Sequence, residues 1–282
     1  MPSSDERHWP GPLIDAHAHL GHSLFGIGQS LDELLASMAM SGIVQSVVVP
    51  LKPRGYHLGP ENDRIAAAVR SHPDRLRGFV RVDPWQDADA LRELRRGLDD
   101  LGLIGLYLHP FEEQFAANDE IVFPLLAELR ERGLPLLLAG GYPSFSHPSQ
   151  IGDLARQFPE VTIIATHGGQ LNISGLLLAD AGRMLRANPN VIMETSGIYR
   201  EDFIEDTVAE LGPERVVFGS NTPYMDQAFE AARVRLAHFD AAAKTAIGRE
   251  NIQRITPRHD MIDTCLQSGV AERGVGDAPG SA

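Results

Sequence analysis

Two histidines stand close together near the start of the chain, in the stretch IDAHAHL. His17 and His19 are two residues apart, and residues at that spacing on a strand point to the same face. Neutral imidazole is a common ligand for divalent metals, so two rings on one face could share one ion. Two histidines at this spacing also occur by chance in loops. The position of His17 and His19 at the end of a predicted strand favours a functional site.

A third histidine ends another apolar run, in the stretch TIIATHGG. Gly168 and Gly169 follow His167 and would let a ligand approach the backbone closely. This pattern indicates a site, and a hydrogen-bonded structural histidine is the alternative. In the run LIGLYLHP, Tyr107 and His109 share one face and could line the same pocket. His109 could equally cap a turn.

Charged residues end two further runs. Arg81 and Asp83 lie on one face of the run RLRGFVRVDP. Arg81 could bind a substrate carboxylate, but a pair with Asp83 is the preferred interpretation. Lys52 and Arg54 follow another run and are expected to be solvated loop charges. Further histidines lack supporting spacing and are expected to have surface or capping roles, namely His8, His57, His72, His147, His238 and His259.

These residues stand at the ends of apolar runs that alternate with helix-like segments. The eight runs are 13–20, 43–50, 75–84, 103–110, 134–141, 161–169, 190–197 and 215–221. Strands alternating with helices predict a parallel sheet, and eight such units in a chain of 282 residues predict an α/β fold, a single (β/α)8 TIM barrel. In such barrels the active site lies at the C-terminal ends of the strands.

The ends of the chain differ from the alternating body. Residues 1–11 are expected to form an N-terminal arm, and residues 12–260 the barrel. The segment 261–282 is rich in Gly, Ala and Ser, and a flexible tail is expected there. Within the body, Ser30 followed by Glu33 predicts the start of a helix, and Gly42 predicts its end.

Composition excludes several classes of protein. The single cysteine, Cys265, allows no disulfide within the chain, which suits a reducing cytoplasm. The formal net charge of -13 disfavours nucleic acid and anionic membranes as partners. The start of the chain shows no secretion signal, and no apolar run reaches the roughly 18 residues of a membrane span. A cytoplasmic protein with a small-molecule substrate is therefore expected.

Five short motifs occur in order between Leu13 and Ile255, namely IDAHAHL, GLYLHP, FPEVTIIATHGG, PERVVFGSNTP and AIGRENIQRI. Together they resemble the amidohydrolase-related family, the branch of the amidohydrolase superfamily that includes metal-dependent hydrolases, lactonases and decarboxylases acting on small carboxylic acids. The resemblance implies that His17 and His19 belong to a metal site. It also implies that His167 polarises or steers the substrate.

The chain departs from this family at two positions. The family usually has a histidine at the end of strand five, where this chain has Ala139. It usually has an aspartate at the end of strand eight, which binds metal and accepts a proton from the attacking water, and here that position is Asn221. Asparagine is a weak ligand for zinc and cannot accept that proton, but it can orient a substrate. His167, His109 and His17 then become the candidates for acid and base work.

The first hypothesis for the function is a hydrolase of a small lactone, ester or cyclic carboxylic acid. Its dependence on metal would be weakened or absent. Asn221, Tyr107 and Arg81 are the residues expected to contact the substrate.

Two alternatives stay open. One is a metal-dependent decarboxylase or hydrolase that holds one divalent metal, such as zinc, on His17, His19 and His167. The other is a catalytically silent barrel that binds a small molecule or a protein. A homodimer is the expected assembly, because barrels of this kind often form one.

Overall fold

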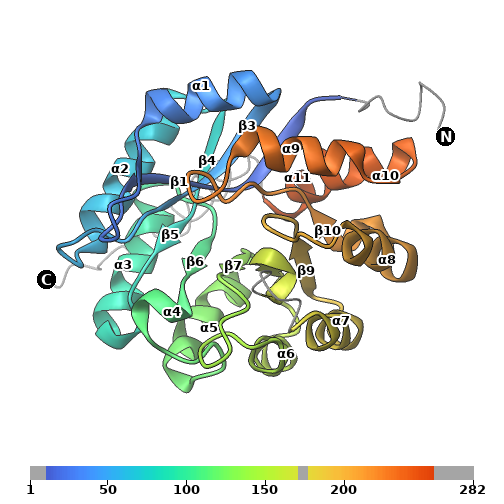
Figure 1. Ribbon diagram of the computed structural model, residues 1–282. Helices are drawn as coiled ribbons and strands as arrows, with labels where there is room; N and C mark the ends of the chain where they lie inside the picture. The colour runs from blue at the N-terminus through green and yellow to red at the C-terminus, as the bar shows by residue number, and fades with distance from the viewer. Residues whose placement is uncertain (1–10, 171–176, 257–282) are drawn as a thin grey trace, which may run out of the picture.

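The eight apolar runs form the strands of the barrel in the computed structural model, which describes residues 11–170 and 177–256 (Figure 1). The parallel strands are β1 (Leu13–His22), β3 (Ile43–Pro50), β4 (Leu76–Gly78), β5 (Val80–Arg81), β6 (Leu106–Leu108), β7 (Leu136–Leu138), β8 (Ile163–Ala165), β9 (Val191–Glu194) and β10 (Val216–Val217). The third run is divided into β4 and β5 at Phe79, whose amide donates to the Val48 carbonyl over 3.1 Å. A short strand β2 (Gly28–Gln29) pairs antiparallel with the end of β1.

Backbone hydrogen bonds close the sheet into a ring. The strand orders are β2-β1-β3-β4 and β10-β9-β8-β7-β6-β5, and β4 leads directly into β5. At the other junction, the Ala16 amide donates to the Phe218 carbonyl over 2.9 Å, and the Asn221 amide donates to the His17 carbonyl over 2.7 Å. The α/β class and the (β/α)8 barrel predicted from the sequence are therefore confirmed.

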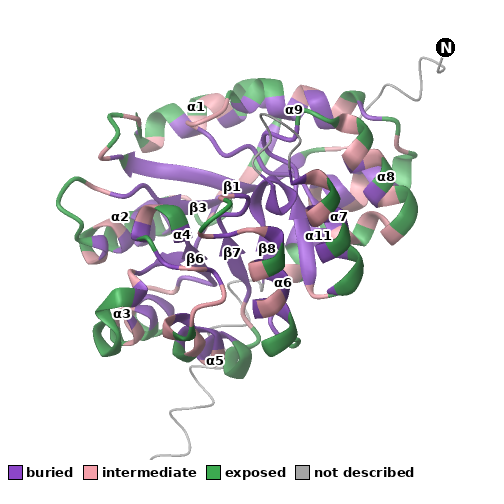
Figure 2. Cartoon of the chain, turned by 60° about the horizontal axis from the view of Figure 1, so that its bottom comes forward, coloured by how far each residue is buried: buried purple, intermediate pink, exposed green. Residues whose placement is uncertain are grey.

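Helices surround the ring of strands and expose their outer faces, while the strands are buried (Figures 1 and 2). The helices are α1 (Leu31–Ser41), α2 (Leu58–Ser71), α3 (Ala88–Asp99), α4 (Pro110–Glu113), α5 (Phe123–Arg132), α6 (Pro148–Gln157), α7 (Leu178–Ala187), α8 (Glu201–Leu211), α9 (Gln227–Leu236), α10 (Ala241–Thr245) and α11 (Asn251–Ile255). The predicted signals of α1 are confirmed, because Ser30 and Glu33 form a capping box and Gly42 ends the helix at φ 65°.

Apolar side chains fill both sides of the sheet. One buried cluster lies between strands and helices and includes Leu34 and Leu129. A second cluster takes inward-facing residues from successive strands, among them Ile14, Leu137 and Ile192. The interior is therefore a packed core rather than a pore, and it supports the strand ends from below.

An irregularity in β1 turns the two histidines toward the barrel mouth. Ile14 and Ala16 belong to the interior cluster, so even-numbered residues face inward at the start of the strand. The pairing with β3 shifts register between Asp15 and Ala18, and beyond the shift the odd-numbered His17 and His19 line the cavity. Bulges of this kind re-aim side chains near functional sites.

Several sequence predictions fall beyond the described ranges. Apart from Gly11, the predicted arm of residues 1–11 and the whole predicted tail of 261–282 lie outside the described residues, as do His8 and His259. These predictions, and the domain limits drawn from them, stay predictions. Within residues 11–170 and 177–256, no helix has the length and apolar character needed to cross a bilayer.

Candidate active site

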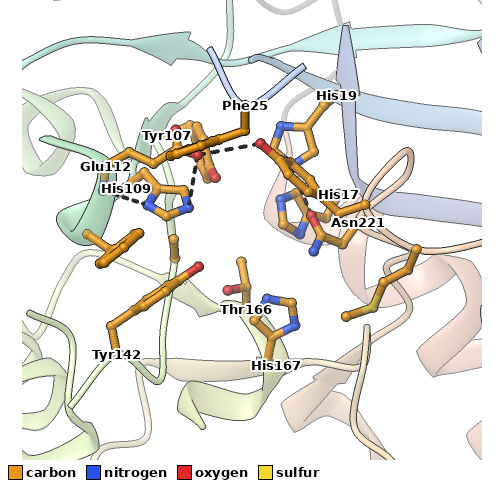
Figure 3. Close-up of a pocket in the computed structure, with 14 residues that line it drawn as sticks. His17, His19, Phe25, Tyr107, His109, Glu112, Tyr142, Thr166, His167 and Asn221 are labelled. Atoms are coloured by element: carbon orange, nitrogen blue, oxygen red, sulfur yellow. Dashed lines mark hydrogen bonds and ion pairs between the residues drawn. The ribbon is translucent and has the colours of Figure 1, made fainter. Parts of the chain in front are cut away.

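A cavity of about 250 Å³ opens at the C-terminal ends of the strands (Figure 3). Its walls are mostly aromatic rings and imidazoles. The lining residues are His17, His19, Phe25, Tyr107, His109, Phe111, Glu112, Ala139, Tyr142, Thr166, His167, Asn221, Tyr224 and Met225. The structure thus brings together every predicted site residue except Arg81. A cavity of this size can hold a small molecule.

The two histidines of β1 lie side by side under this cavity. Their ring centroids are 4.7 Å apart, and the ring of Tyr107 lies 5.8 Å from His17 and 5.7 Å from His19. Burial, followed by the nearby His17, lowers the pKa of His19 well below its usual value. Both nitrogens of His17 and Nδ1 of His19 are buried without a hydrogen-bond partner. Buried polar atoms of this kind are candidates for contact with a ligand.

Asn221 contacts His19 directly. Its Oδ1 lies 2.9 Å from Nε2 of His19, so this ring nitrogen donates and the amide nitrogen of Asn221 can donate to a ligand. The backbone of Asn221 is left-handed at φ 55°, a conformation that asparagine adopts more readily than most residues. Asp15 fixes this loop to β1, because it accepts hydrogen bonds from the Ser220 amide over 2.9 Å and from Gln227 over 2.8 Å.

His167 is held by the loop after β9. Its Nδ1 lies 2.8 Å from the carbonyl oxygen of Ser196, which can only accept, so Nδ1 carries the proton in the neutral ring. Nε2 is then the nitrogen that can exchange a proton with a ligand. Burial lowers the pKa of His167, while the charge of Glu194 opposes this shift. The His167 backbone is left-handed at φ 56°, and such conformations are common at functional sites.

Glu194 was missed by the sequence reasoning. It is fully buried at the end of β9 and accepts hydrogen bonds from the amides of His167 over 3.2 Å and Ser196 over 2.6 Å. Its Oε2 lies 3.5 Å from Nδ1 of His17, and no hydrogen bond forms between the two atoms. A Cβ at Gly219 would collide with Glu194, which explains the glycine there. The strand-end rule could have found this residue, since it is the last residue of β9, which lies within the seventh apolar run.

His109 caps the short helix α4. Its Nδ1 accepts a hydrogen bond from the Glu112 amide over 3.2 Å, so the proton of the neutral ring is on Nε2. Burial lowers the pKa of His109 to about 3. Both alternatives from the sequence therefore hold, since His109 caps a turn and lines the cavity. Glu112 of α4 also lines it, as do Tyr142 and Tyr224 from loops without a readable motif.

The structure corrects two predictions for Arg81. Arg81 does not pair with Asp83, which caps a helical turn through the Trp85 amide. The guanidinium of Arg81 instead binds the carboxylates of Glu112 and Glu113 behind the cavity wall. Arg81 lines no part of the cavity, because its guanidinium is bound to the two carboxylates of α4. Direct contact between Arg81 and a substrate is therefore not supported.

Lys52 was expected to be solvated and is buried. Its ammonium lies 3.4 Å from Glu113 and also donates to the Glu112 carbonyl, because α4 packs over the end of β3. Arg54 is exposed as predicted. The described histidines assigned to surface or capping roles agree with prediction. His57, His72 and His147 stand at helix ends, and His238 is exposed beside Glu205.

The residues present do not fit a mononuclear catalytic metal site. Such sites use about three protein ligands plus water. His17 and His19 offer imidazoles and Asn221 a neutral amide oxygen, but Ala139 offers no donor. Within the described parts of the chain, no group of three or more His, Cys, Asp or Glu side chains could hold a metal ion. The predicted set of His17, His19 and His167 is not among such groups, and the ring centroids of His17 and His167 lie 6.4 Å apart.

The buried histidines predict a loss of stability in mild acid. Burial lowers the pKa of His19, His109 and His167, whereas an unfolded histidine titrates near about 6.5. Below that pH the unfolded state binds more protons than the folded state, so the free energy of unfolding should fall as the pH falls. The expected slope is about 1.4 kcal/mol per pH unit for each proton that the fold excludes.

Urea denaturation between about pH 7.5 and about pH 5.5 measures this slope. Burial raises the pKa of Glu230 to about 7, which opposes the slope equally in the wild type and in the histidine variants. The slope should become shallower in His109→Asn and stay unchanged in His238→Asn, because His238 is exposed. Equal slopes in the wild type and His109→Asn would show that His109 takes up its proton in the folded state.

Comparison with known proteins supports the resemblance to amidohydrolases that the sequence motifs indicate. A family model described as Amidohydrolase matches residues 14–257. The gamma-resorcylate decarboxylase of Rhodococcus jostii (strain RHA1) is 26% identical in an alignment of 244 residues that covers 67% of this chain and 73% of the relative.

Solved structures share the barrel. The 2,6-dihydroxybenzoate decarboxylase from Rhizobium has a TM-score of 0.70 at 19% identity, covering 87% of this chain and 98% of that chain. A dihydroxybenzoic acid decarboxylase from Polaromonas sp. JS666, with bound manganese and the inhibitor 2-nitroresorcinol, has a TM-score of 0.70 at 17% identity. It covers 87% of this chain and 96% of that chain. At these identities the likeness shows the fold.

Proposed function

Because this chain belongs to the amidohydrolase family, we propose that it is a decarboxylase that removes the carboxyl group from a small aromatic carboxylic acid. One observation carries the proposal. The end of strand eight presents Asn221, hydrogen-bonded to His19, and an amide cannot accept the proton that an attacking water must lose in hydrolysis. The relatives described above, which are all decarboxylases by name, support the same chemistry.

Hydrolysis and decarboxylation make different demands on this position. Hydrolysis of a lactone or an ester needs a base that takes a proton from the attacking water. Asn221 cannot accept that proton, and Glu112, the carboxylate that lines the cavity, is bound to Arg81. Decarboxylation needs no attacking water, only a proton for the carbon that loses CO2. A hydrolase at this site would have to use a histidine such as His167 as its base, and the named activity of the relatives favours decarboxylation.

The cavity suits a flat aromatic acid. Phe111 and Tyr142 stack with an interplanar angle of 5° and a centroid distance of 4.7 Å, and with Tyr107 they offer flat apolar surface for a ring. The amide nitrogen of Asn221 can donate a hydrogen bond to the substrate carboxylate. Burial away from water strengthens each of these polar contacts.

His167 is the residue placed to supply the proton. When protonated, its Nδ1 donates to the Ser196 carbonyl and its Nε2 carries the second proton. Burial lowers the pKa of His167, and Glu194 opposes that shift. A bound substrate carboxylate adds a second negative charge that favours the protonated ring. His167 then gives the Nε2 proton to the ring carbon that bears the carboxylate. The bond from that carbon to the carboxylate breaks, its electrons restore the aromatic ring, CO2 leaves, and His167 regains a proton from solvent.

Decarboxylation of hydroxylated benzoic acids tests this proposal. Purified protein is incubated with 2,6-dihydroxybenzoate and related acids, and the loss of acid and release of CO2 are followed with added manganese or with a chelator. We expect CO2 release that the chelator does not abolish, because the donor set is incomplete. Hydrolysis of simple lactones without any CO2 release would overturn the proposal.

Restoring the two missing donors should create a metal site. In the double variant Ala139→His with Asn221→Asp, affinity for zinc or manganese should rise by more than about 100-fold, since changes that leave the ligands in place already cost about 10–100-fold. Elemental analysis and calorimetric titration measure this gain, with Ala139→His alone as the intermediate control. Equal metal content in the wild type and the double variant would contradict the expectation.

A further inference from the structure

Glu112 lies in the cavity and has no part in the proposed proton transfer. It belongs to α4, the short helix after β6, and its side chain is 5% exposed. Its carboxylate projects into the cavity beside His109 (Figure 3). A buried carboxylate in a site for acids needs an explanation, because it repels the carboxylate of the substrate.

Buried cations hold Glu112 in its charged form. Its Oε2 is bound by Arg81, which also lies 2.8 Å from Glu113. Lys52 adds a second cation, 3.4 Å from Glu113. The four side chains are all buried, and two basic groups face two carboxyl groups. Burial raises the pKa of Glu112, but Arg81, His109 and Lys52 outweigh it and leave the pKa below its usual value.

The second oxygen of Glu112 is poorly satisfied. Among the described residues, Oε1 lies 3.4 Å from the hydroxyl of Tyr224 and 3.8 Å from Nε2 of His109. An O–H···O hydrogen bond to a carboxylate is usually about 2.5–2.7 Å long. Oε1 therefore has lone pairs free for a donor from a ligand, and an ionised carboxylate can only accept.

The position of Glu112 also favours one orientation of the substrate in the cavity. Figure 3 shows Glu112 on one side of the cavity, while Asn221 and His167 occupy other sides. Repulsion from Glu112 favours binding of a substrate carboxylate beside Asn221. The opposite end of the substrate then faces Oε1.

We infer that Glu112 determines specificity by accepting a hydrogen bond from a hydroxyl or amino group on the substrate, at the end away from its carboxylate. Arg81 and Lys52 act as positioning residues that fix this carboxylate. The inference rests on the proposed function in one respect, namely that the substrate carries a carboxylate. A binding experiment without turnover can test the role of Glu112.

Calorimetric titration of matched probes tests the role of Glu112. The probes are the three monohydroxybenzoates, their methyl ethers and benzoate, since a methyl ether fills the same place without a donor. We expect at least one hydroxybenzoate to bind the wild type about 10–100-fold more tightly than its methyl ether, as for a charge-assisted hydrogen bond. In Glu112→Gln this ratio should fall by about 10-fold or more. Glu113→Gln disturbs the same cations outside the cavity and should leave the ratio unchanged.

Each other outcome overturns the inference. Equal binding of hydroxybenzoates and methyl ethers by the wild type would do so without any variant. An equal loss for every probe in Glu112→Gln would show a purely structural role, and so would a loss of the ratio in Glu113→Gln. Absence of binding by all probes would also contradict it. The binding experiment and the CO2 assay test different proposals. Selective binding of hydroxybenzoates without CO2 release would contradict the proposed decarboxylase and leave the role of Glu112 intact.

Discussion

Replacing His167 with asparagine should lower kcat for decarboxylation by about 100- to 10,000-fold, the usual contribution of a positioned proton donor. Asparagine is a suitable replacement because it tolerates the left-handed backbone at this position. Its side-chain amide can also keep the hydrogen bond to the Ser196 carbonyl that Nδ1 of His167 makes. The fold should therefore survive while the exchangeable proton is lost.

Steady-state kinetics across a pH series measure this effect. KM should change much less than kcat, because the substrate contacts assigned to Asn221 and Glu112 remain. The limb of the pH profile that reports the donor should also disappear. His238→Asn is the matched control, since His238 is exposed on the surface beside Glu205. A His167→Asn enzyme with full kcat would remove His167 from the proposed mechanism.

Replacing Arg81 with methionine should lower the free energy of unfolding by about 3–5 kcal/mol, the range expected when one partner of a buried ion pair is removed. The guanidinium of Arg81 is buried between Glu112 and Glu113. Without it, Lys52 would be left to balance two buried carboxylates. Methionine keeps most of the apolar stem, so the loss reports charge rather than volume.

Urea denaturation at neutral pH measures this loss, and two variants control it. Arg92→Met removes an exposed pair with Asp89 and should cost less than about 1 kcal/mol. Adding Glu112→Gln to Arg81→Met leaves Lys52 to balance Glu113 alone and should restore part of the stability. A cost below about 1 kcal/mol for Arg81→Met would mean that water reaches these carboxylates.

The two variants also separate the parts of the site. His167 touches the reacting atoms in the proposed mechanism, so its replacement should change chemistry more than stability. Arg81 acts only through Glu112, so its replacement should change stability and substrate selectivity together. An Arg81→Met variant that loses its preference for hydroxybenzoates over methyl ethers but keeps its kcat would support these separate roles.

Much of the barrel could be predicted from the sequence because its signals are local. Apolar runs bounded by Gly and Pro mark the strands, and the signals at Ser30, Glu33 and Gly42 mark α1. The pair His17 and His19 was placed correctly in the cavity, because residues two apart on a strand share a face. Strand ends in a parallel barrel meet at one mouth, so His109 and His167 could be added by the same rule.

Tertiary structure decided how the charged residues pair. Arg81 binds Glu112 and Glu113, about thirty residues away in sequence, although Asp83 stands two residues away. The return of the chain through α3 to β6 and α4 sets this pairing, and no local spacing records it. Lys52 is buried for the same reason, since α4 covers it. Such burial demands a compensating charge, and the fold alone determines which residue supplies it.

The sequence by itself determined the barrel, the histidines at its mouth and the replacement of a carboxylate by Asn221. Only the tertiary structure decided that His19 binds Asn221, that Glu194 supports His167, and that Glu112 faces the cavity. The physical reason is that hydrophobic periodicity is written along the chain. Hydrogen bonds and ion pairs between distant segments depend on how strands align, down to the register shift in β1 that turns its histidines toward the mouth.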